Sequence, residues 1–202
     1  MSLSSIVRGL GAPGRLSRAF GRDARGIAAV EFGYLVPVIL LMLVGVFEVS
    51  RAVLMDRRLG LVTTMVADLV GREEKMTAAD LTAVYKIVNE VMSPFDASTL
   101  KVSVIPVKAS PTDATNTRVY PATTNRPSYN GGTQPAKCAA YGMTAGLVPK
   151  GASVIVIETK YKYTPIFPNY IYGSADWTDK AVVSPRHSCV DFDGDNCVST
   201  CF

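Results

Sequence analysis

One acidic residue and one glycine are the clearest chemical feature of this sequence. Glu31 stands five residues after Gly26, and residues 32–47 that follow it carry no charge. A carboxylate in membrane hydrocarbon costs about 2–4 kcal/mol even on permissive insertion scales. Cleavage of the peptide bond after Gly26 would create an α-amino group at Ile27. That ammonium is the kind of partner that a carboxylate in a membrane requires.

Both residues also have simpler interpretations. A glutamate at the membrane border can extend its carboxylate to the lipid headgroups of an ordinary signal anchor. Gly26 can be a flexible residue before a helix, whereas at a cleavage site its missing side chain would let a peptidase approach the backbone closely. Spacing alone does not separate these interpretations.

The segment from Arg25 to Phe32 resembles the class III signal of type IV pilins and pseudopilins. That signal consists of a basic leader, a glycine, four small or apolar residues, a glutamate and an aromatic residue, here Arg25-Gly26-Ile27-Ala28-Ala29-Val30-Glu31-Phe32. More specifically, it is similar to the TadE-like family of minor pilins from tight-adherence (Tad/Flp) pilus systems. The similarity extends through Pro37, Glu48 and Arg51, and returns faintly at residues 161–168 and 181–186.

The resemblance implies a processing step and a subunit contact. A prepilin peptidase would cut between Gly26 and Ile27. Glu31, followed by Phe32, would then neutralise the N-terminal ammonium of an adjacent subunit as helices bundle into a filament. An amine and a carboxylate pair strongly in hydrocarbon because each alone is severely penalised.

The resemblance also implies a function and a set of partners. The protein would be a minor pilin or pseudopilin required for assembly of adhesive Flp pili. Because the residues show no catalytic constellation, we also expect no enzymatic activity, no cofactor and no metal. The implied partners are the prepilin peptidase, another minor pilin, the major Flp pilin and inner-membrane platform proteins. The chain departs from the small major pilins by its large C-terminal part, which favours a tip or initiator over a repeated shaft subunit.

The charge distribution predicts the membrane topology. Residues 1–26 hold five arginines and one aspartate, which equals the whole net charge of +4. Ile27–Phe47 provides about the 20 apolar residues that a bilayer-spanning helix needs. The positive-inside rule predicts a cytoplasmic leader and a translocated C-terminal domain. The resemblance implies that the chain is a single-pass inner-membrane protein and that this domain is periplasmic. Because the remainder has balanced charges, we expect no nucleic-acid surface.

We therefore expect three parts: a leader over residues 1–26, cleaved in the mature chain; a transmembrane helix over residues 27–47; and a periplasmic α+β domain over residues 48–202. A removed secretory signal peptide is disfavoured because the apolar run exceeds a typical signal core and no A-x-A-like site lies in residues 43–50.

The first helix is expected to continue beyond the membrane, from Ile27 to about Val70, because apolar residues recur at helical spacing after the span. Pro37 predicts a kink or local melting, and Gly60 weakens the helix. Glu48 and Arg51, three residues apart, are expected to form a helix-surface ion pair or, alternatively, to contact neighbouring subunits.

The rest of the chain predicts a second helix and a small antiparallel sheet. Thr77 and Asp80 form a capping-box variant before a single apolar stripe that ends at Ser93-Pro94. Strands are predicted over residues 100–107, with Pro106 making the distal end an edge or a bulge, over residues 153–163, and over residues 179–184. Residues 108–136, rich in Pro, Thr, Asn, Ser and Gly, are predicted to form a long exposed, flexible loop.

All four cysteines, Cys138, Cys189, Cys197 and Cys201, lie in the expected exported domain and predict two disulfides with three possible pairings. A local Cys189–Cys197 loop, with Cys138 joined to Cys201, is the weakly favoured arrangement. Free-thiol chemistry is the competing interpretation.

Other polar groups give weaker signals. Residues 191–196 resemble a calcium loop, but glycine stands fourth rather than sixth and the twelfth position is Phe202, so an acidic turn is the default interpretation. His187 and Cys189 lack an orienting third group for nucleophilic catalysis, and no zinc-type pair is present. Trp177 and the tyrosines at 161, 163, 170 and 172 are expected to pack in the core and on the sheet.

Two rival functions remain open at this point. The first is an uncleaved, signal-anchored periplasmic adaptor of an envelope assembly complex. The second is a periplasmic thiol or metal enzyme that uses the C-terminal cysteines.

Overall fold

The computed structural model describes residues 25–167, 173–194, 197 and 201–202 of the 202-residue chain. The predictions for the leader up to residue 24, for Tyr170 and Tyr172, and for positions 195–196 lie outside the described residues. The chain divides into two compact units between Phe47 and Glu48. The described elements are α2 (Arg25–Arg72), α3 (Ala78–Met92), η1 (Ala97–Thr99), β1 (Lys101–Ala109), β2 (Thr117–Val119), η2 (Thr123–Asn125), β3 (Ser153–Tyr163) and β4 (Ala175–Val183).

Helix α2 is long and continuous, and it contributes its first part to one unit and the rest to the other. It remains helical through Pro37 and Gly60, so the expected local melting at Pro37 was wrong. A proline removes one backbone hydrogen bond, but its fixed φ is itself helical, and the neighbouring bonds can hold the turn. The expectation of one helix from Ile27 to about Val70 is confirmed.

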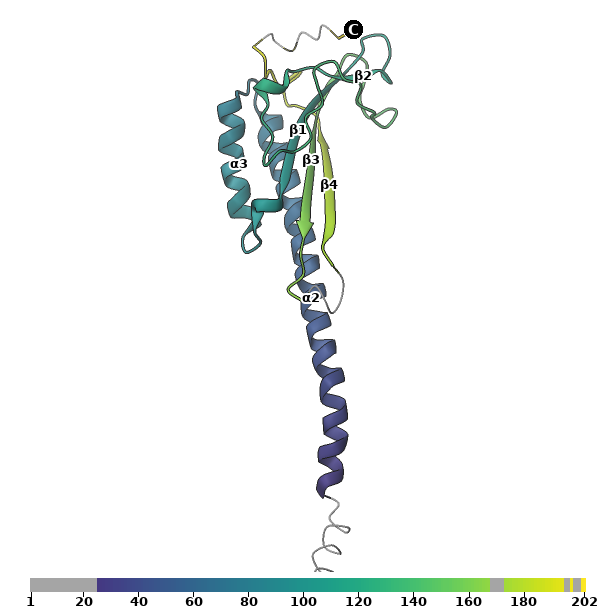
Figure 1. Cartoon of the computed structure of the whole chain (residues 1–202). Helices are drawn as coiled ribbons and strands as arrows, with labels where there is room; N and C mark the ends of the chain where they lie inside the picture. The colour runs from purple at the N-terminus through teal and green to yellow at the C-terminus, as the bar shows by residue number, and fades with distance from the viewer. Residues whose placement is uncertain (1–24, 168–172, 195–196, 198–200) are drawn as a thin grey trace, which may run out of the picture. The chain divides into compact units, whose positions relative to one another are not determined.

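The second unit is built around a single main core to which both helices contribute. Buried residues of α2 recur every three or four positions, which places them on one face of the helix. They are Ala52, Met55, Leu59, Val62, Val66, Ala67 and Val70. Figure 1 shows α3 beside this outer part of α2, and the core unites both helices with the sheet.

Helix α3 begins and ends where its local sequence predicts. The Thr77 hydroxyl accepts the amide of Asp80, and an Asp80 carboxylate oxygen accepts the amide of Thr77, which completes the capping box. The apolar stripe buries Leu81, Tyr85 and Val88 among others. At the other end, Arg58 of α2 donates to the carbonyl of Val91 at 2.8 Å, which satisfies one of the last backbone acceptors of α3.

The sheet has the order β2-β1-β3-β4 and all its pairs are antiparallel. Successive side chains of β1 and β3 point to opposite faces of the sheet. Val104 and Ile157 pack on the helix side, whereas Ile105 and Val156 join a smaller core on the opposite side together with Val148. The predicted α+β class with a small antiparallel sheet is thus confirmed.

Two strand predictions need correction, and one strand was missed. β1 continues to Ala109, and its register with β3 is unbroken through Pro106 to Lys108, so this end is neither an edge strand nor a bulge. The carbonyl of Pro106 accepts the amide of Tyr120, on the side where β2 has already ended, so the missing proline N–H interrupts no ladder. β4 begins at Ala175, earlier than predicted, and the strand β2 was not predicted.

Residues 108–136 are not a uniformly exposed loop, as was predicted. They contain β2, and Val119, Tyr120 and Arg126 are buried. Tyr129 pairs with Val102 and extends the sheet beside the first half of β1. Gly132 lies so close to β1 that a Cβ there would meet the carbonyl oxygen of Val102 at 2.8 Å.

The side chain of Arg126 explains how this segment is fixed. Its guanidinium donates to the carbonyls of Val104 and Pro135 and to the side chain of Gln134. A buried arginine is tolerated only when its donors are satisfied. The fixed, packed path of this segment therefore depends on one cation that composition alone does not reveal.

Candidate functional site

The residues proposed for processing and subunit contact lie at the start of α2. Gly26 is the second residue of the helix, and a Cβ placed there would meet nothing within 4 Å. Ile27 and Phe32 are 60% and 64% exposed. Glu31 is exposed too, and no other described residue donates a hydrogen bond or forms an ion pair with its carboxylate.

Ile27 and Glu31 share one face of α2, because residues four apart lie one turn above each other. Large apolar side chains surround them on the same helix. Those at least half exposed within the span are Ile27, Val30, Phe32, Tyr34, Leu35, Val38, Ile39, Leu40, Leu41, Met42, Leu43, Val46 and Phe47. An apolar surface of this extent requires lipid or other helices as its surroundings.

Glu48, the first residue of the second unit, does not lie on the helix surface as predicted. Its side chain is fully buried. One carboxylate oxygen accepts the backbone amides of Ile166 and Phe167 at 2.8 and 3.1 Å, and the other accepts the Tyr163 hydroxyl at 3.3 Å. The expected ion pair with Arg51 is therefore replaced by three neutral donors, and the Arg51 guanidinium lies 5.6 Å from the Phe95 ring centre.

The sequence did contain a signal for the burial of Glu48. The position continues the three- and four-residue spacing of the buried α2 face, four residues before Ala52 and seven before Met55. The spacing therefore places this carboxylate on the core face rather than among the exposed arginines. What the sequence did not reveal is the set of donors, which come from the end of β3 and the turn after it.

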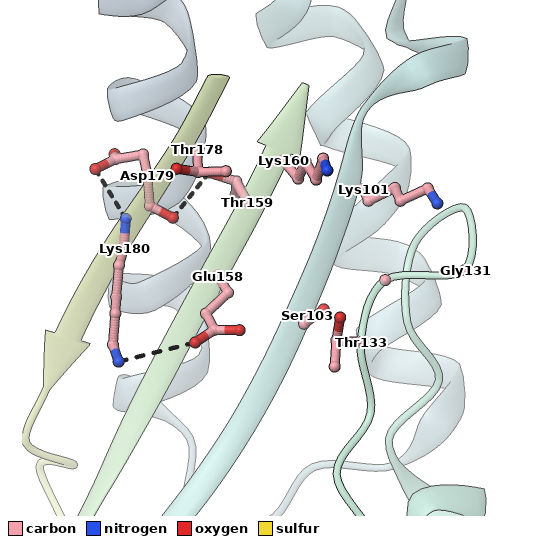
Figure 2. A pocket seen from close by; sticks show the side chains of 11 residues that line it. Lys101, Ser103, Gly131, Thr133, Glu158, Thr159, Lys160, Thr178, Asp179 and Lys180 are labelled. Carbon is pink, nitrogen blue, oxygen red and sulfur yellow. Dashed lines mark hydrogen bonds and ion pairs between the residues drawn. The ribbon is translucent and has the colours of Figure 1, made fainter. Parts of the chain in front are cut away.

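An open groove lies on the sheet face opposite the helices. Figure 2 shows Lys101 and Ser103 of β1, Glu158 and Lys160 of β3, and Thr178 and Lys180 of β4, with the loop at Gly131 beside them. Lys160 forms an ion pair with Asp176 at 2.8 Å, and Lys180 lies 3.8 Å from Glu158. Charges of both signs thus offset each other along the groove.

Tyr141 contacts two charged residues of this groove, Glu158 and Lys180. Its hydroxyl donates to the Glu158 carboxylate, and the Lys180 ammonium donates to the same hydroxyl at 2.8 Å. Burial, together with the bond to Glu158, raises the pKa of Tyr141 well above its usual value. The phenol stays protonated at neutral pH, so it acts as a hydrogen-bond donor rather than as a base.

All four cysteines are joined in disulfides. Cys138 pairs with Cys201 across 63 positions and Cys189 pairs with Cys197 across 8, which is the favoured arrangement of the three. No cysteine is free. His187 is exposed, and its neighbour Cys189 offers no thiolate for nucleophilic chemistry.

Asp191 and Asp193 of the acidic turn both accept hydrogen bonds from the protein itself. Asp191 accepts the amide of Gly194 at 2.8 Å, while Asp193 accepts from Asn125 and Lys137 at 2.9 and 3.0 Å. Burial alone would raise the pKa of Asp193, but these hydrogen bonds and that of the Ala122 amide lower it. In the part of the chain that the structure describes, no group of three His, Cys, Asp or Glu side chains gathers around a metal-sized space.

The arrangement defines a class of protein. One long apolar N-terminal helix fits single-pass membrane anchoring, and it continues into an α+β unit cross-linked by two disulfides. The family model described as TadE-like protein matches residues 26–68, the region that holds Gly26, Glu31 and Glu48. No curated protein and no solved structure matches the chain.

The match bears out the TadE-like resemblance over this region and supports involvement of the chain in a Tad pilus system. The family is associated with pilus components and the membrane, and it is not an enzyme family.

Proposed function

We propose that this protein is a minor pilin or pseudopilin required for assembly of Flp/Tad-type adhesive pili. It is made as an inner-membrane precursor with a cytoplasmic N-terminus and a periplasmic C-terminal domain, and a prepilin peptidase cuts it after Gly26. The observation that carries the proposal is the TadE-like match, which begins at Gly26 and includes Glu31.

Glu31 is the residue that brings subunits into register. In the single chain its carboxylate is exposed on an apolar helix without a partner among the described residues. After cleavage, the ammonium at Ile27 of a neighbouring subunit supplies the counter-charge. Pairing within hydrocarbon favours one axial alignment of adjacent helices, because any other alignment leaves two charges in a medium that solvates neither.

The partners follow from this role. The prepilin peptidase acts on the leader junction, and the second minor pilin, the major Flp pilin and the platform proteins contact the exposed apolar helix in the membrane. The two disulfides support export to an oxidising compartment. They also argue against a thiol enzyme, because no cysteine is free.

An uncleaved, signal-anchored adaptor is the alternative, and intact mass separates the two. The chain is expressed together with a prepilin peptidase, extracted from membranes and weighed before and after reduction. A chain that begins at Ile27 and gains the mass of four hydrogen atoms on reduction supports the proposal. Retention of residues 1–26 would support the adaptor.

Gly26→Val, with Gly33→Val as its matched control, tests the recognition of the glycine. A Cβ at either position meets nothing within 4 Å, so neither change disturbs the packing of the chain. We expect Gly26→Val to remain uncut because the added bulk keeps the peptidase from the backbone. Gly33→Val should be cut as wild type, and equal cleavage of both variants would contradict a glycine-specific site.

A further inference from the structure

The turn after β3 exposes two large apolar side chains while its backbone is fixed. Ile166 is 49% exposed and Phe167 37%. Their amides donate to the buried Glu48 carboxylate at 2.8 and 3.1 Å, which anchors the turn to α2. A rigid turn that displays apolar side chains needs an apolar environment to face.

The position of Glu48 in the sequence indicates which environment that is. Ile27–Phe47 supplies about the 20 residues that fill the roughly 30 Å hydrocarbon layer, and Glu48 follows directly. The interfacial layer outside the hydrocarbon is about 5–8 Å thick on each side. A turn within hydrogen-bond distance of the Glu48 carboxylate therefore falls inside that layer.

We propose that the turn at residues 165–167 is a membrane-contact site, with Ile166 and Phe167 inserted among the lipids at the periplasmic surface. Cations accompany it: Arg51 and Lys162 line one small pocket with Tyr163 and Thr164, the residues that lead into the turn. Lipid phosphates are suitable partners for these cations, although Asp96 shares the same pocket. The proposal rests on the membrane span and not on pilus assembly.

Glu48 makes this contact possible. A carboxylate at the edge of the hydrocarbon requires hydrogen-bond donors. It takes two of them from the turn, so the backbone amides of Ile166 and Phe167 are bonded within the chain. The side chains of the turn are then the groups left to face the lipid.

Fluorescence quenching by brominated lipids tests the contact directly. The full chain is placed in nanodiscs of phosphatidylcholine brominated near the headgroup end of the acyl chains. Trp177 is the only tryptophan of the chain, so Trp177→Phe provides a silent background. Phe167→Trp reports on the turn, Leu41→Trp on the span and Leu147→Trp on an exposed site beside Val148, which packs at the other end of β3.

We expect emission to fall by about half for Phe167→Trp and for Leu41→Trp, relative to unbrominated lipid, with no change for Leu147→Trp. Retention of both disulfides by mass, and of the far-ultraviolet spectrum, shows that the variants are folded. An unquenched Phe167→Trp beside a quenched Leu41→Trp overturns the proposal and leaves the span intact. Loss of quenching at both sites overturns it as well, because the span itself is then outside the bilayer.

A protein partner could cover the turn instead of lipid. In that case Phe167→Trp would be unquenched in nanodiscs, and its emission would shift to the blue only when a companion subunit is added. That result also overturns the lipid assignment.

Discussion

Glu31 and Glu48 are two glutamates on one helix with opposite surroundings. Glu48 is fully buried and accepts three hydrogen bonds from its own chain. Glu31 is exposed and has no partner among the described residues. The first carboxylate is satisfied by folding of the single chain, whereas the second remains available for a charge supplied by another molecule.

The apolar side chains of α2 show the same contrast. From Ala52 to Val70 one face is buried in the core of the second unit. From Ile27 to Phe47 nearly all of them are exposed in the single chain. Substitutions in the two regions should therefore act on different properties. Those between Ala52 and Val70 should change the stability of the folded domain, and those between Ile27 and Phe47 should change membrane insertion and assembly.

The largest effect on stability should come from the long disulfide. Replacing Cys138 and Cys201 by serine releases a loop of 63 positions and should lower the free energy of unfolding by about 4 kcal/mol on the chain-entropy account. Opening the 8-position Cys189–Cys197 loop should cost about 2.5 kcal/mol. Denaturant unfolding in detergent, followed by Trp177 emission, measures both, and extraction of either variant from membranes should be unchanged. Equal losses would contradict the loop-length argument.

Glu48→Ala should be next in size. It removes the acceptor of three hydrogen bonds, and water can replace only those of the exposed turn, so we expect a loss of about 3 kcal/mol in the free energy of unfolding. Glu73→Ala changes an exposed glutamate directly after the end of the same helix and should stay within about 0.5 kcal/mol. If the two variants were equally stable, the buried role of Glu48 would be wrong.

A pair of valines compares the two regions of α2 directly. Val62 is fully buried, and Val62→Ala should destabilise the domain by about 2 kcal/mol through lost burial and a cavity. Val30 is 58% exposed, and Val30→Ala should leave domain unfolding within about 0.5 kcal/mol of wild type. The same denaturant titration reports both, and a large effect of Val30→Ala would mean that the first region is packed after all.

The smallest effect should come from the cap of α3. Thr77→Ala removes the capping hydroxyl and should cost about 1 kcal/mol at neutral pH. The hydrogen bonds from the Thr77 side chain and backbone lower the pKa of Asp80 below 3.8. A lowered carboxyl pKa stabilises the fold above the unfolded value, and this contribution is lost as pH falls through the lowered value. The difference between wild type and Thr77→Ala should therefore shrink when unfolding is measured at decreasing pH below 4.

Local signals were enough to predict α3 and β3. The capping residues, the apolar stripe and the Ser93-Pro94 ending of α3 all lie within one short segment. β3 begins with a continuous β-branched run, residues 154–157, and alternates between buried and more exposed residues only in its second half. Both elements are strongly patterned and do not need information from distant parts of the chain. The anchor was predictable for the same reason, because its length and lack of charge are properties of one continuous run.

The missed features depend on contacts between distant segments. β2 has only three residues, and its place is set by pairing with Val107–Ala109 and not by its own pattern. Arg126 is buried because its donors meet carbonyls of β1 and of the following loop. The donors to Glu48 come from more than 100 positions away in the sequence. Composition could suggest an exposed loop and a surface ion pair, but it could not supply these partners.

The central claim is that Glu31 pairs with the N-terminus of a neighbouring subunit, and Glu31→Gln tests it most directly. The variant keeps the size of the side chain and removes its charge, and it is produced in cells that carry the companion minor pilin and the major Flp pilin. We predict a chain that still begins at Ile27 by intact mass but no longer co-purifies with its companions or supports piliation. A Glu31→Gln chain that matures, associates and supports pili as well as wild type would contradict the claim.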